Sequence, residues 1–208
     1  MLILEQYGVK LIRLQEEEIE LVRHWRNQSD IANYMEYRNY ITEEAQKKWF
    51  KSVNNKYNYY FIIHFENKKV GLINAKNYDP VTGFGEGGIF IWDNEYINSF
   101  AAPFSSLCLL NFMFLKVTFS HRSRIRILKN NERAIQYNKL LGYKLLLGQE
   151  GVDNQLYELD VKDYLIHGSK LNKVAAILSD YKEELLYSGT VCSENMDEIN
   201  QLLINKST

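Results

Sequence analysis

Histidine and cysteine side chains, which often carry metal or nucleophilic chemistry, form no familiar pattern in this sequence. The histidines are His24, His64, His121 and His167, and none has the spacing of a zinc-binding helix or finger. The two cysteines, Cys108 and Cys192, match neither a zinc motif nor a disulfide framework. Cys108 lies in an apolar run and is expected to be a buried hydrophobic residue. The sequence therefore predicts no metal site.

The segment from Asn98 to Ala102 has residues suited to binding a phosphate. Asn98 and Ser99 are good N-caps for the apolar helix that follows, and Pro103 suits a first helical turn. Backbone N–H groups at such a terminus favour an anion. Small residues such as Ala101 and Ala102 would let a phosphate approach the backbone closely.

The hydrophobic pattern predicts the scaffold for these residues. Runs of alternating or continuous apolar residues predict strands at 9–14, 59–65, 70–75, 88–92, 123–128, 143–147 and 156–159. Helical spacing predicts helices at 16–26, about 43–53, from about 98 to 117, and at 131–141, with a short turn at 29–35. Gly142 is a C-cap candidate. Beyond 162 we expect an amphipathic helix at 171–186, a loop at 188–196 and a short helix at 199–204.

Composition places the chain among ordinary globular proteins. Of its 208 residues, 46% are hydrophobic and 25% charged, and the formal net charge is −1. The absence of a basic excess argues against a nucleic-acid partner. The most apolar segment, 100–117, is shorter than the roughly 20 residues that a membrane span needs, so no membrane is expected. The N-terminus lacks a signal-peptide pattern, and we expect a cytoplasmic protein.

Three stretches, together with the order of the elements, give a resemblance to a known family. Residues 128–143 (LKNNERAIQYNKLLGY) are similar to the N-x-x-A-I-x-x-x-x-K-L-G-F segment of the Gcn5-related N-acetyltransferases (GNAT). Residues 88–96 (GIFIWDNEY) resemble the G-I-x-I-x-P-E-Y that precedes the family's pyrophosphate loop. Residues 23–35 and 42–50 resemble two branches, which acetylate ribosomal-protein N-termini or amino groups of nucleotide-linked sugars. The resemblance covers about residues 9–160.

The resemblance implies the fold and the domains. The expected fold class is α/β (α+β), with a central, mixed but mostly antiparallel sheet of about seven strands. That sheet would be splayed between its fourth and fifth strands and would carry helices on both faces. Residues 1–162 would form the GNAT acetyltransferase domain. Residues 163–208 would form a mainly helical C-terminal extension of unknown role.

The resemblance also implies acetyl-CoA as co-substrate and a set of residues beside it. A backbone N–H at Ile91 or Trp92 would stabilise the oxyanion. The expected contacts with the cofactor are Ile91, Trp92, Asn98, Ser99, Phe100, Ala101, Ala102, Asn131, Ala134 and Asn138. Three positions depart from the family pattern, and the first is Ile97, which replaces a polar residue of the pyrophosphate loop. Phe100 stands where the first glycine of the pyrophosphate loop is usual, and Asn138 stands where a tyrosine general acid is usual.

Glu86 is the first candidate for a general base, because related enzymes often carry an acidic residue just before this strand. His64 is a second candidate, and Asn138 completes the expected catalytic set. Trp25, Arg26 and Tyr34 would border the acceptor pocket. Plainer alternatives remain open: a surface carboxylate at 86, a core histidine at 64, a core Trp25 and a surface Arg26.

The predicted function is transfer of acetyl from acetyl-CoA to a primary amine. A nucleotide-linked amino sugar is the preferred acceptor, and a protein N-terminus is the alternative. A non-catalytic GNAT-like binding or regulatory domain is the third reading. The expected partners are thus a small-molecule amine or a peptide N-terminus. The C-terminal extension also leaves a homodimer open.

Overall fold

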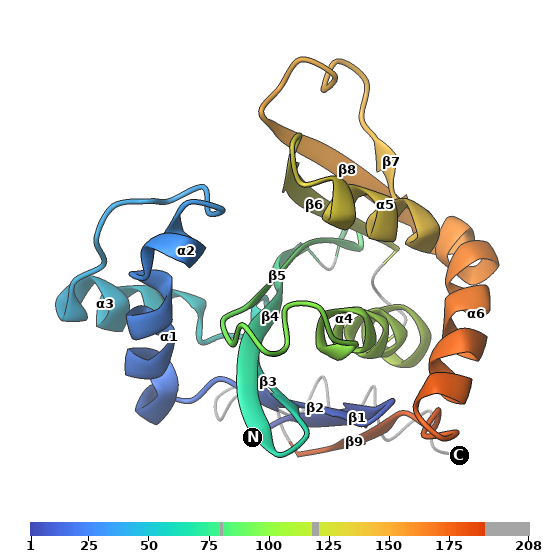
Figure 1. Cartoon of the computed structure of the whole chain (residues 1–208), viewed down its shortest axis with the longest axis horizontal. Helices are drawn as coiled ribbons and strands as arrows, with labels where there is room; N and C mark the ends of the chain where they lie inside the picture. Colours follow the sequence, from blue (N-terminus) through green and yellow to red (C-terminus); the bar gives the residue numbers. More distant parts are fainter. Residues whose placement is uncertain (80, 118–120, 190–208) are drawn as a thin grey trace.

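A nine-stranded sheet forms the centre of the protein in the computed structural model, which describes residues 1–79, 81–117 and 121–189 (Figure 1). The strand order is β7-β8-β6-β5-β4-β3-β2-β1-β9. The strands are β1 (Ile3–Gln6), β2 (Val9–Arg13), β3 (Tyr59–Phe65), β4 (Lys68–Asp79), β5 (Phe84–Ile91), β6 (Arg122–Leu128), β7 (Lys144–Leu145), β8 (Asn154–Asp160) and β9 (Leu186–Ser188). Only β5 and β6 are parallel, and every other described pair is antiparallel.

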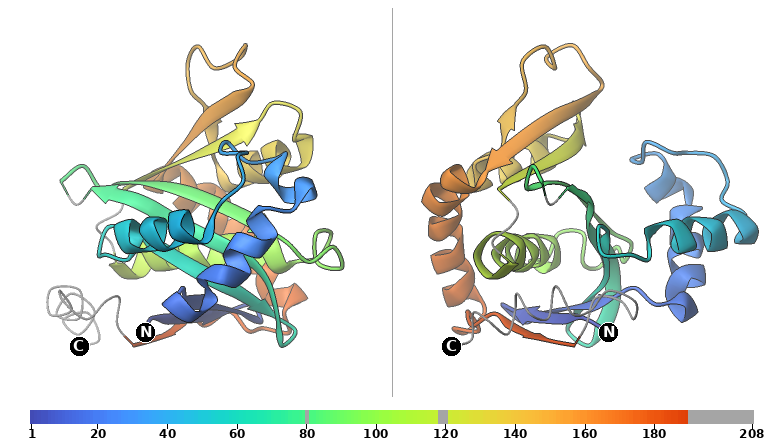
Figure 2. Two further views of the ribbon diagram at one scale, coloured as in Figure 1. Left: turned by 90° about the vertical axis from the view of Figure 1, so that its left-hand side faces the viewer. Right: turned by 180° about the vertical axis from the view of Figure 1, so that it is seen from behind.

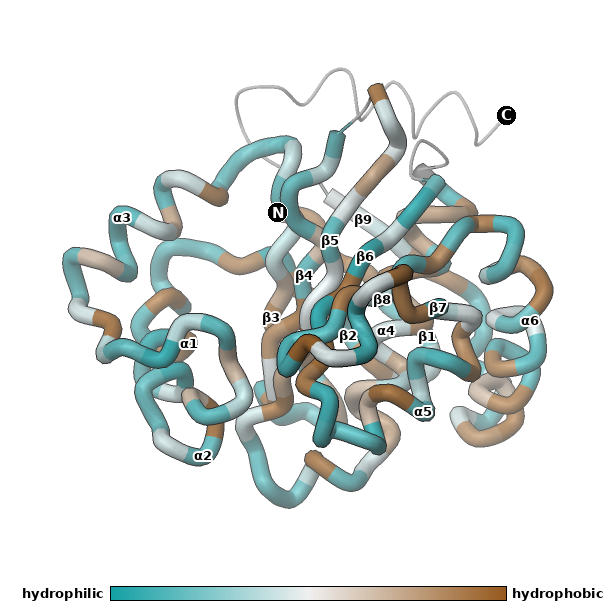
Figure 3. Tube along the Cα trace, turned by 90° about the horizontal axis from the view of Figure 1, so that it is seen from above, coloured by the Kyte–Doolittle hydropathy of each residue, from teal (hydrophilic) through white to brown (hydrophobic). Residues whose placement is uncertain are grey.

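Helices cover both faces of the sheet, as the view from above shows (Figure 3). One face carries the group η1 (Glu16–Glu18), α1 (Ile19–Arg26), α2 (Ser29–Ala32) and α3 (Glu43–Val53). The other carries α4 (Ala101–Asn111) with its π-helical continuation η2 (Phe112–Val117), α5 (Glu132–Leu141) and α6 (Val161–Leu178). The expected mixed, mostly antiparallel α+β sheet is confirmed, with β1 and β9 as added strands.

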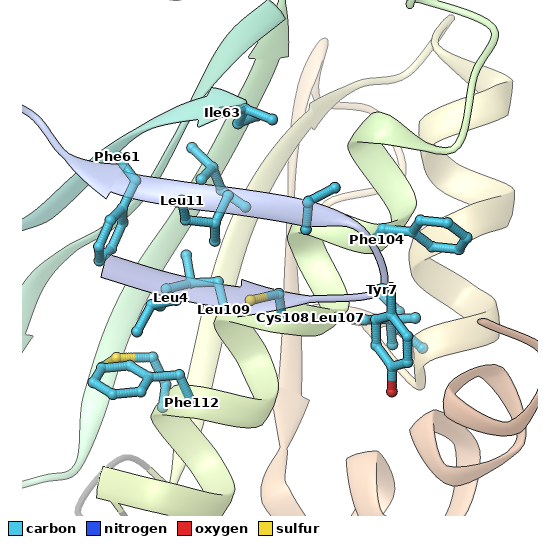
Figure 4. Packing of buried hydrophobic residues seen from close by; sticks show 14 of the residues in the cluster. Leu4, Tyr7, Leu11, Phe61, Ile63, Phe104, Leu107, Cys108, Leu109 and Phe112 are labelled. Atoms are coloured by element: carbon cyan, nitrogen blue, oxygen red, sulfur yellow. The ribbon is translucent and has the colours of Figure 1, made fainter. Parts of the chain in front are cut away.

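Two hydrophobic clusters hold these layers together. The larger lies between the sheet and α4, where Leu4, Leu11 and Phe61 meet Cys108 and Phe112 (Figure 4). Cys108 is fully buried, as its apolar surroundings predicted. The smaller cluster lies under α1 and α3 and includes Val22, Phe50, Ile62 and Trp92. Because each cluster uses alternate residues of the same strands, the two faces of the sheet are lined by different side chains.

Local capping chemistry explains where several helices begin and end. Thr42 Oγ1 accepts the Ala45 N–H at 3.2 Å, and Asn131 Oδ1 accepts the Ala134 N–H at 3.1 Å. Gly142 ends α5 with φ of +103°, a conformation that favours glycine. The helix expected from Asn98 or Ser99 begins later, at Ala101. Ser99 still contributes, because its Oγ accepts the Ala101 N–H at 3.1 Å.

The C-terminal helix differs from its prediction in position and in its buried face. It occupies 161–178 rather than 171–186, because Asp160 accepts the Lys162 N–H as an N-cap, and Leu186 belongs to β9. Small residues, Gly168, Ala175 and Ala176, face the protein and allow close packing. The apolar side chains expected to be buried, Val174, Ile177 and Leu178, are exposed. The predicted helix at 199–204 and the predicted loop beyond residue 189 lie outside the described residues.

A buried polar network joins this extension to the sheet. Asn111, at the end of α4, donates to Gln6 Oε1 at 2.9 Å and to Asn172 Oδ1 at 3.0 Å, and it accepts the Tyr164 hydroxyl at 2.7 Å. Tyr7 also donates to Asn172 at 2.8 Å. Seen from behind, α6 runs beside α4 from the end of β8 towards β9 (Figure 2). The network therefore fixes α6 against α4 and β1.

No helix among the described residues is long and apolar enough to cross a membrane.

We predict that Asn111→Ala lowers the free energy of unfolding by about 2–4 kcal/mol, because the buried groups of Gln6, Tyr164 and Asn172 would lose their shared partner. Urea denaturation followed by circular dichroism measures this. Asn94→Ala is the control, since Asn94 is exposed and should shift stability by less than about 0.5 kcal/mol. Equal stabilities of the two variants would show that the network contributes nothing.

Candidate functional site

The site begins where the sheet opens between β5 and β6. These strands pair only from Phe84 to Gly87 of β5 with Arg122 to Ile125 of β6, although β5 continues to Ile91 and β6 to Leu128. Beyond Gly87 each strand keeps its other neighbour, β4 or β8. The sheet is thus splayed at its one parallel pair among the described strands.

The splay leaves backbone groups of β5 open to a ligand. Trp92 donates its backbone N–H to the Val70 carbonyl of β4 at 2.9 Å. Because hydrogen-bonding direction alternates along a strand, the N–H groups of Ile89 and Ile91 point the other way, into the gap. Of the two donors considered for an oxyanion, Ile91 is therefore available and Trp92 is engaged. The Trp92 indole is also used, since it donates to the Lys69 carbonyl at 2.8 Å.

The N-terminus of α4 lies directly after this strand. The turn 94–100 leads into α4, and the N–H groups of Phe100 and Ala102 have no hydrogen-bond acceptor among the described residues. The Phe100 ring stacks on Phe104, with centroids 5.2 Å apart, so it is directed along the helix. The position that is usually glycine therefore keeps its N–H accessible. Two free N–H groups at a helix N-terminus suit an anion.

Helix α5 contributes a cation to the same region, which sequence reasoning missed. Arg133 Nη1 donates to Asn98 Oδ1, so its guanidinium reaches the loop before α4. The sequence could have indicated this, because Arg133 lies two residues after Asn131, which was expected to contact the cofactor. Asn131 itself caps α5 through the Ala134 N–H. The Asn138 side chain donates to the Ala134 carbonyl at 2.8 Å, so one of its two amide hydrogens is used within the helix.

The opposite face of the sheet holds the candidate base. Glu86 pairs in register with Lys76 of β4, and its carboxylate lies 2.9 Å from Lys76 Nζ. Tyr60 of β3 is buried near it. Burial raises the pKa of the Tyr60 hydroxyl to about 12, with the Glu86 charge raising it further and Arg26 acting against this. The Tyr60 hydroxyl is therefore neutral at pH 7, and the charges of Glu86 and Arg26 both affect its pKa.

Arg26, at the end of α1, lies over the ring of Phe90 with 5.9 Å from Cζ to the centroid. Its Nη2 donates to the Tyr37 carbonyl at 3.3 Å, while its Nε is buried without a hydrogen-bond partner among the described residues. No carboxylate in that part of the chain pairs with it. Burial lowers the pKa of this guanidinium, which nevertheless remains a cation at neutral pH.

The remaining acceptor-side candidates have different surroundings. Trp25 stacks on Trp92 at 6.2 Å with nearly parallel rings, so it forms part of the packed floor beneath Arg26. Tyr34 is exposed on the segment after α2. The structure thus brings Glu86 and Arg26 to one face, with Trp25 beneath them. Their functional roles stay predictions.

His64 is not brought to this site. It pairs in register with Lys69 of β4, whereas Glu86 pairs with Lys76 of the same strand. At about 3.3 Å per residue these two levels are roughly 20 Å apart. Burial and the nearby Lys69 lower the pKa of His64, and its Nε2 has no hydrogen-bond partner among the described residues. The two candidate bases therefore lie too far apart to act on the same amine, and the choice between them stays a prediction.

Two further residues lie on the Glu86 face and were also missed. Asn74 of β4 stands opposite Gly88, and its Oδ1 is buried without a described partner. Arg126 of β6 is exposed and lacks an ion-pair partner among the described residues. It shares a face with Arg124, which pairs in register with Glu86. Once the register of the strands is known, the alternation of side chains between the two faces places both residues on the same face as Glu86.

Within the described residues, no group of three or more His, Cys, Asp or Glu side chains could hold a metal ion. The free N–H groups at α4, the open edge at Ile89 and Ile91, and Arg133 instead fit a long ligand that carries a diphosphate. Such a ligand could lie along β5 inside the splay. This combination is an open strand edge beside a helix N-terminus, in the middle of a mixed sheet.

The comparison with protein families names the class of protein. Residues 9–144 match the model described as "Acetyltransferase (GNAT) domain". The chain belongs to the GNAT acetyltransferase family, whose members use acetyl-CoA to acetylate amines. A search of curated proteins finds no match.

Solved structures give the same fold at low sequence identity. Apo FdhC, described as a nucleotide-linked sugar GNAT, has a TM-score of 0.66 and 18% identity over 86% of this chain and 97% of its own. RimL, a ribosomal L7/L12 α-N-protein acetyltransferase with coenzyme A, has a TM-score of 0.64 and 14% sequence identity. The match covers 76% of this chain and 96% of RimL. Vibrio cholerae spermidine N-acetyltransferase, with CoA and spermine, has a TM-score of 0.63 and 15% sequence identity. The match covers 76% of this chain and 98% of the enzyme. These identities establish the fold alone.

We predict that Ala102→Asp raises the dissociation constant for acetyl-CoA about tenfold or more, because a carboxylate would face the diphosphate at the α4 N-terminus. The same carboxylate favours the helix dipole, so the variant should unfold at an equal or slightly higher temperature. Calorimetric titration and thermal unfolding measure the two effects.

Ala102→Ser is the matched control and should bind acetyl-CoA nearly as the parent does. Unchanged affinity in Ala102→Asp would mean that the diphosphate is bound elsewhere.

Proposed function

We propose that this protein transfers acetyl from acetyl-CoA to the primary amine of an acceptor that also carries an anionic group, of which a nucleotide-linked amino sugar is the best candidate. One observation carries the choice of acceptor. Arg26 is a partly buried cation with no carboxylate partner among the described residues, and it lies on the same face as Glu86. An anionic substituent would supply the missing partner.

The charges around Glu86 support the same acceptor. Lys76, Arg26 and Arg126 lie on this face, and Lys76 alone is paired with Glu86. A polyamine would meet more positive than negative charge there, and like charges in a partly buried site are unfavourable. An amine joined to a phosphate would instead place opposite charges at Glu86 and at the arginines.

The chemistry that these residues can perform follows from their places. An ordinary alkyl amine has a pKa near 10, so only about one in a thousand is neutral at pH 7. Glu86 can accept the proton that the amine must release, directly or through water. The Ile91 N–H can donate to the carbonyl oxygen as charge develops on it. Acetyl-CoA, when bound, supplies the acetyl group as a thioester.

Asn138 has little to contribute as an acid. One of its two amide hydrogens is engaged by the Ala134 carbonyl, and an amide does not release a proton near neutral pH. A thiol has a pKa near 8.5, so a thiolate is already a fair leaving group. The site can therefore work without the usual tyrosine.

We predict that Glu86→Gln lowers kcat/KM for the acceptor about 100- to 1,000-fold at pH 7, because the variant cannot accept the proton. The loss should shrink as pH rises towards 9, since more of the amine is then neutral without help. Steady-state kinetics between pH 6.5 and 9.5 measure this. Glu17→Gln is the control, because Glu17 is exposed. A pH-independent loss would assign Glu86 to binding rather than to proton transfer.

The acceptor class is tested with a panel of nucleotide-linked amino sugars, N-terminal peptides and spermidine, assayed with the parent and with Arg26→Gln. We expect turnover of a nucleotide-linked amino sugar, and a KM for it that rises about tenfold to a hundredfold in the variant, as for loss of a charged hydrogen bond. The KM for acetyl-CoA should not change. Lys170→Gln, an exposed cation on α6, is the control.

Preferred turnover of a peptide would replace the proposed acceptor by a protein N-terminus. Absence of turnover, together with absence of acetyl-CoA binding, would favour a non-catalytic domain.

A further inference from the structure

Three exposed tyrosines follow one another at intervals of three residues on the segment between α2 and α3. Tyr34, Tyr37 and Tyr40 are 64%, 55% and 70% exposed. None of the three rings stacks on another aromatic ring among the described residues. The Tyr40 hydroxyl accepts a hydrogen bond from Arg23 Nη1 at 3.4 Å. Three large rings so exposed within seven residues offer a surface on which a ligand or partner can bind.

The backbone of this segment is fixed although its rings are exposed. Asn27 of the α1–α2 connection donates to the Ile41 carbonyl at 2.9 Å and accepts the Ile41 N–H at 2.8 Å. Arg23 also donates to that carbonyl at 3.3 Å, and Arg26 donates to the Tyr37 carbonyl. A held segment presents its rings at little entropic cost to binding. In Figure 1 the segment rises on the side of the sheet opposite to α5.

Contacts of Arg26 connect the backbone of this segment to the proposed reaction site. Ile91, the candidate oxyanion donor, follows Phe90 in β5, and Phe90 carries the Arg26 guanidinium on its ring. Arg26 in turn is bonded to Tyr37. The order in space is thus a base and N–H donor, then an unpaired cation, then exposed aromatic rings. A nucleotide-linked amino sugar presents its parts in the same order: amine, phosphates, nucleobase.

We propose that Tyr34, Tyr37 and Tyr40 form a stacking platform for the nucleobase of the acceptor, with Arg26 binding the phosphates beside it. The inference rests on the proposed function and adds to it that the enzyme also binds the nucleobase of the acceptor. Base stacking on a tyrosine tolerates different bases, because every base has a π-face. The platform therefore selects a nucleoside diphosphate and leaves the choice of base open.

Calorimetric titration with uridine, thymidine, cytidine and guanosine diphosphates tests the platform, with inorganic pyrophosphate as the probe that lacks a base. All titrations contain saturating coenzyme A, so that the second nucleotide site of the protein is filled. For the tightest of these probes, Tyr37→Leu and Tyr34→Leu should each weaken binding about fivefold to a hundredfold. Tyr37→Phe should stay within about twofold of the parent, because its ring still stacks.

Two controls separate stacking from other effects. Binding of pyrophosphate should be the same in the leucine variants and the parent, whereas Arg26→Gln should weaken both pyrophosphate and the nucleotides. Tyr181→Leu removes another exposed ring, after α6, and should change neither. Circular dichroism checks that each variant is folded.

The possible failures are distinguishable. If a nucleotide-linked amino sugar is acetylated in an Arg26-dependent way but the leucine variants bind nucleotides like the parent, the platform is overturned and the proposed function stands. If no nucleoside diphosphate binds while acetyl-CoA does and a peptide is acetylated, both are overturned. Loss of pyrophosphate binding in the leucine variants would also contradict the inference, since the rings would then act on the phosphates.

Discussion

The structure depends on one interrupted strand pair. β5 and β6 share a parallel ladder of only a few residues and then separate, which leaves the inner edge of β5 unpaired in the middle of a sheet. Unpaired backbone N–H groups of this kind need partners, and here a ligand can provide them. The N–H groups of Ile89 and Ile91 are therefore open to a ligand because of where pairing stops, whatever the side chains. The α4 N-terminus gains its role from following this edge directly.

The separation has to be held open by something other than the strands themselves. β6, β7, β8 and α5 meet the rest of the protein through the short ladder and through hydrogen bonds from α5 to the start of α4. α6 supplies a further connection. Asn111 bonds to Tyr164 and Asn172 of α6 as well as to Gln6 of β1. The bonds to Gln6 and Tyr164 are buried, and the bond to Asn172 is partly buried. A satisfied buried network is rigid and specifies one arrangement. α6 thus helps to hold the strands on the two sides of the splay in a fixed arrangement.

Features with local causes could be predicted from the sequence, and features with distant causes could not. Helix α5 was predicted closely because Asn131 and Gly142 fix its ends by their own chemistry. The splay itself came from resemblance, since no local pattern says where a ladder stops. For α6 the apolar spacing predicted the wrong buried face. Gly168, Ala175 and Ala176 pack against the protein, while larger apolar residues face solvent. The separation of His64 from Glu86 could not be predicted either, because strand register decides distance along the sheet.

The two faces of the sheet carry different chemistry, and the gap is where they can meet. On the α4 side, backbone N–H groups and Arg133 suit a diphosphate. On the α1 side, Glu86 can accept a proton, with an unpaired Arg26 nearby. The continuous parts of the sheet keep these sets apart, which prevents one anionic ligand from occupying both. Ligands of the two faces can therefore meet between Gly88 and Ile91, where the strand has a neighbour on one side and an open edge on the other.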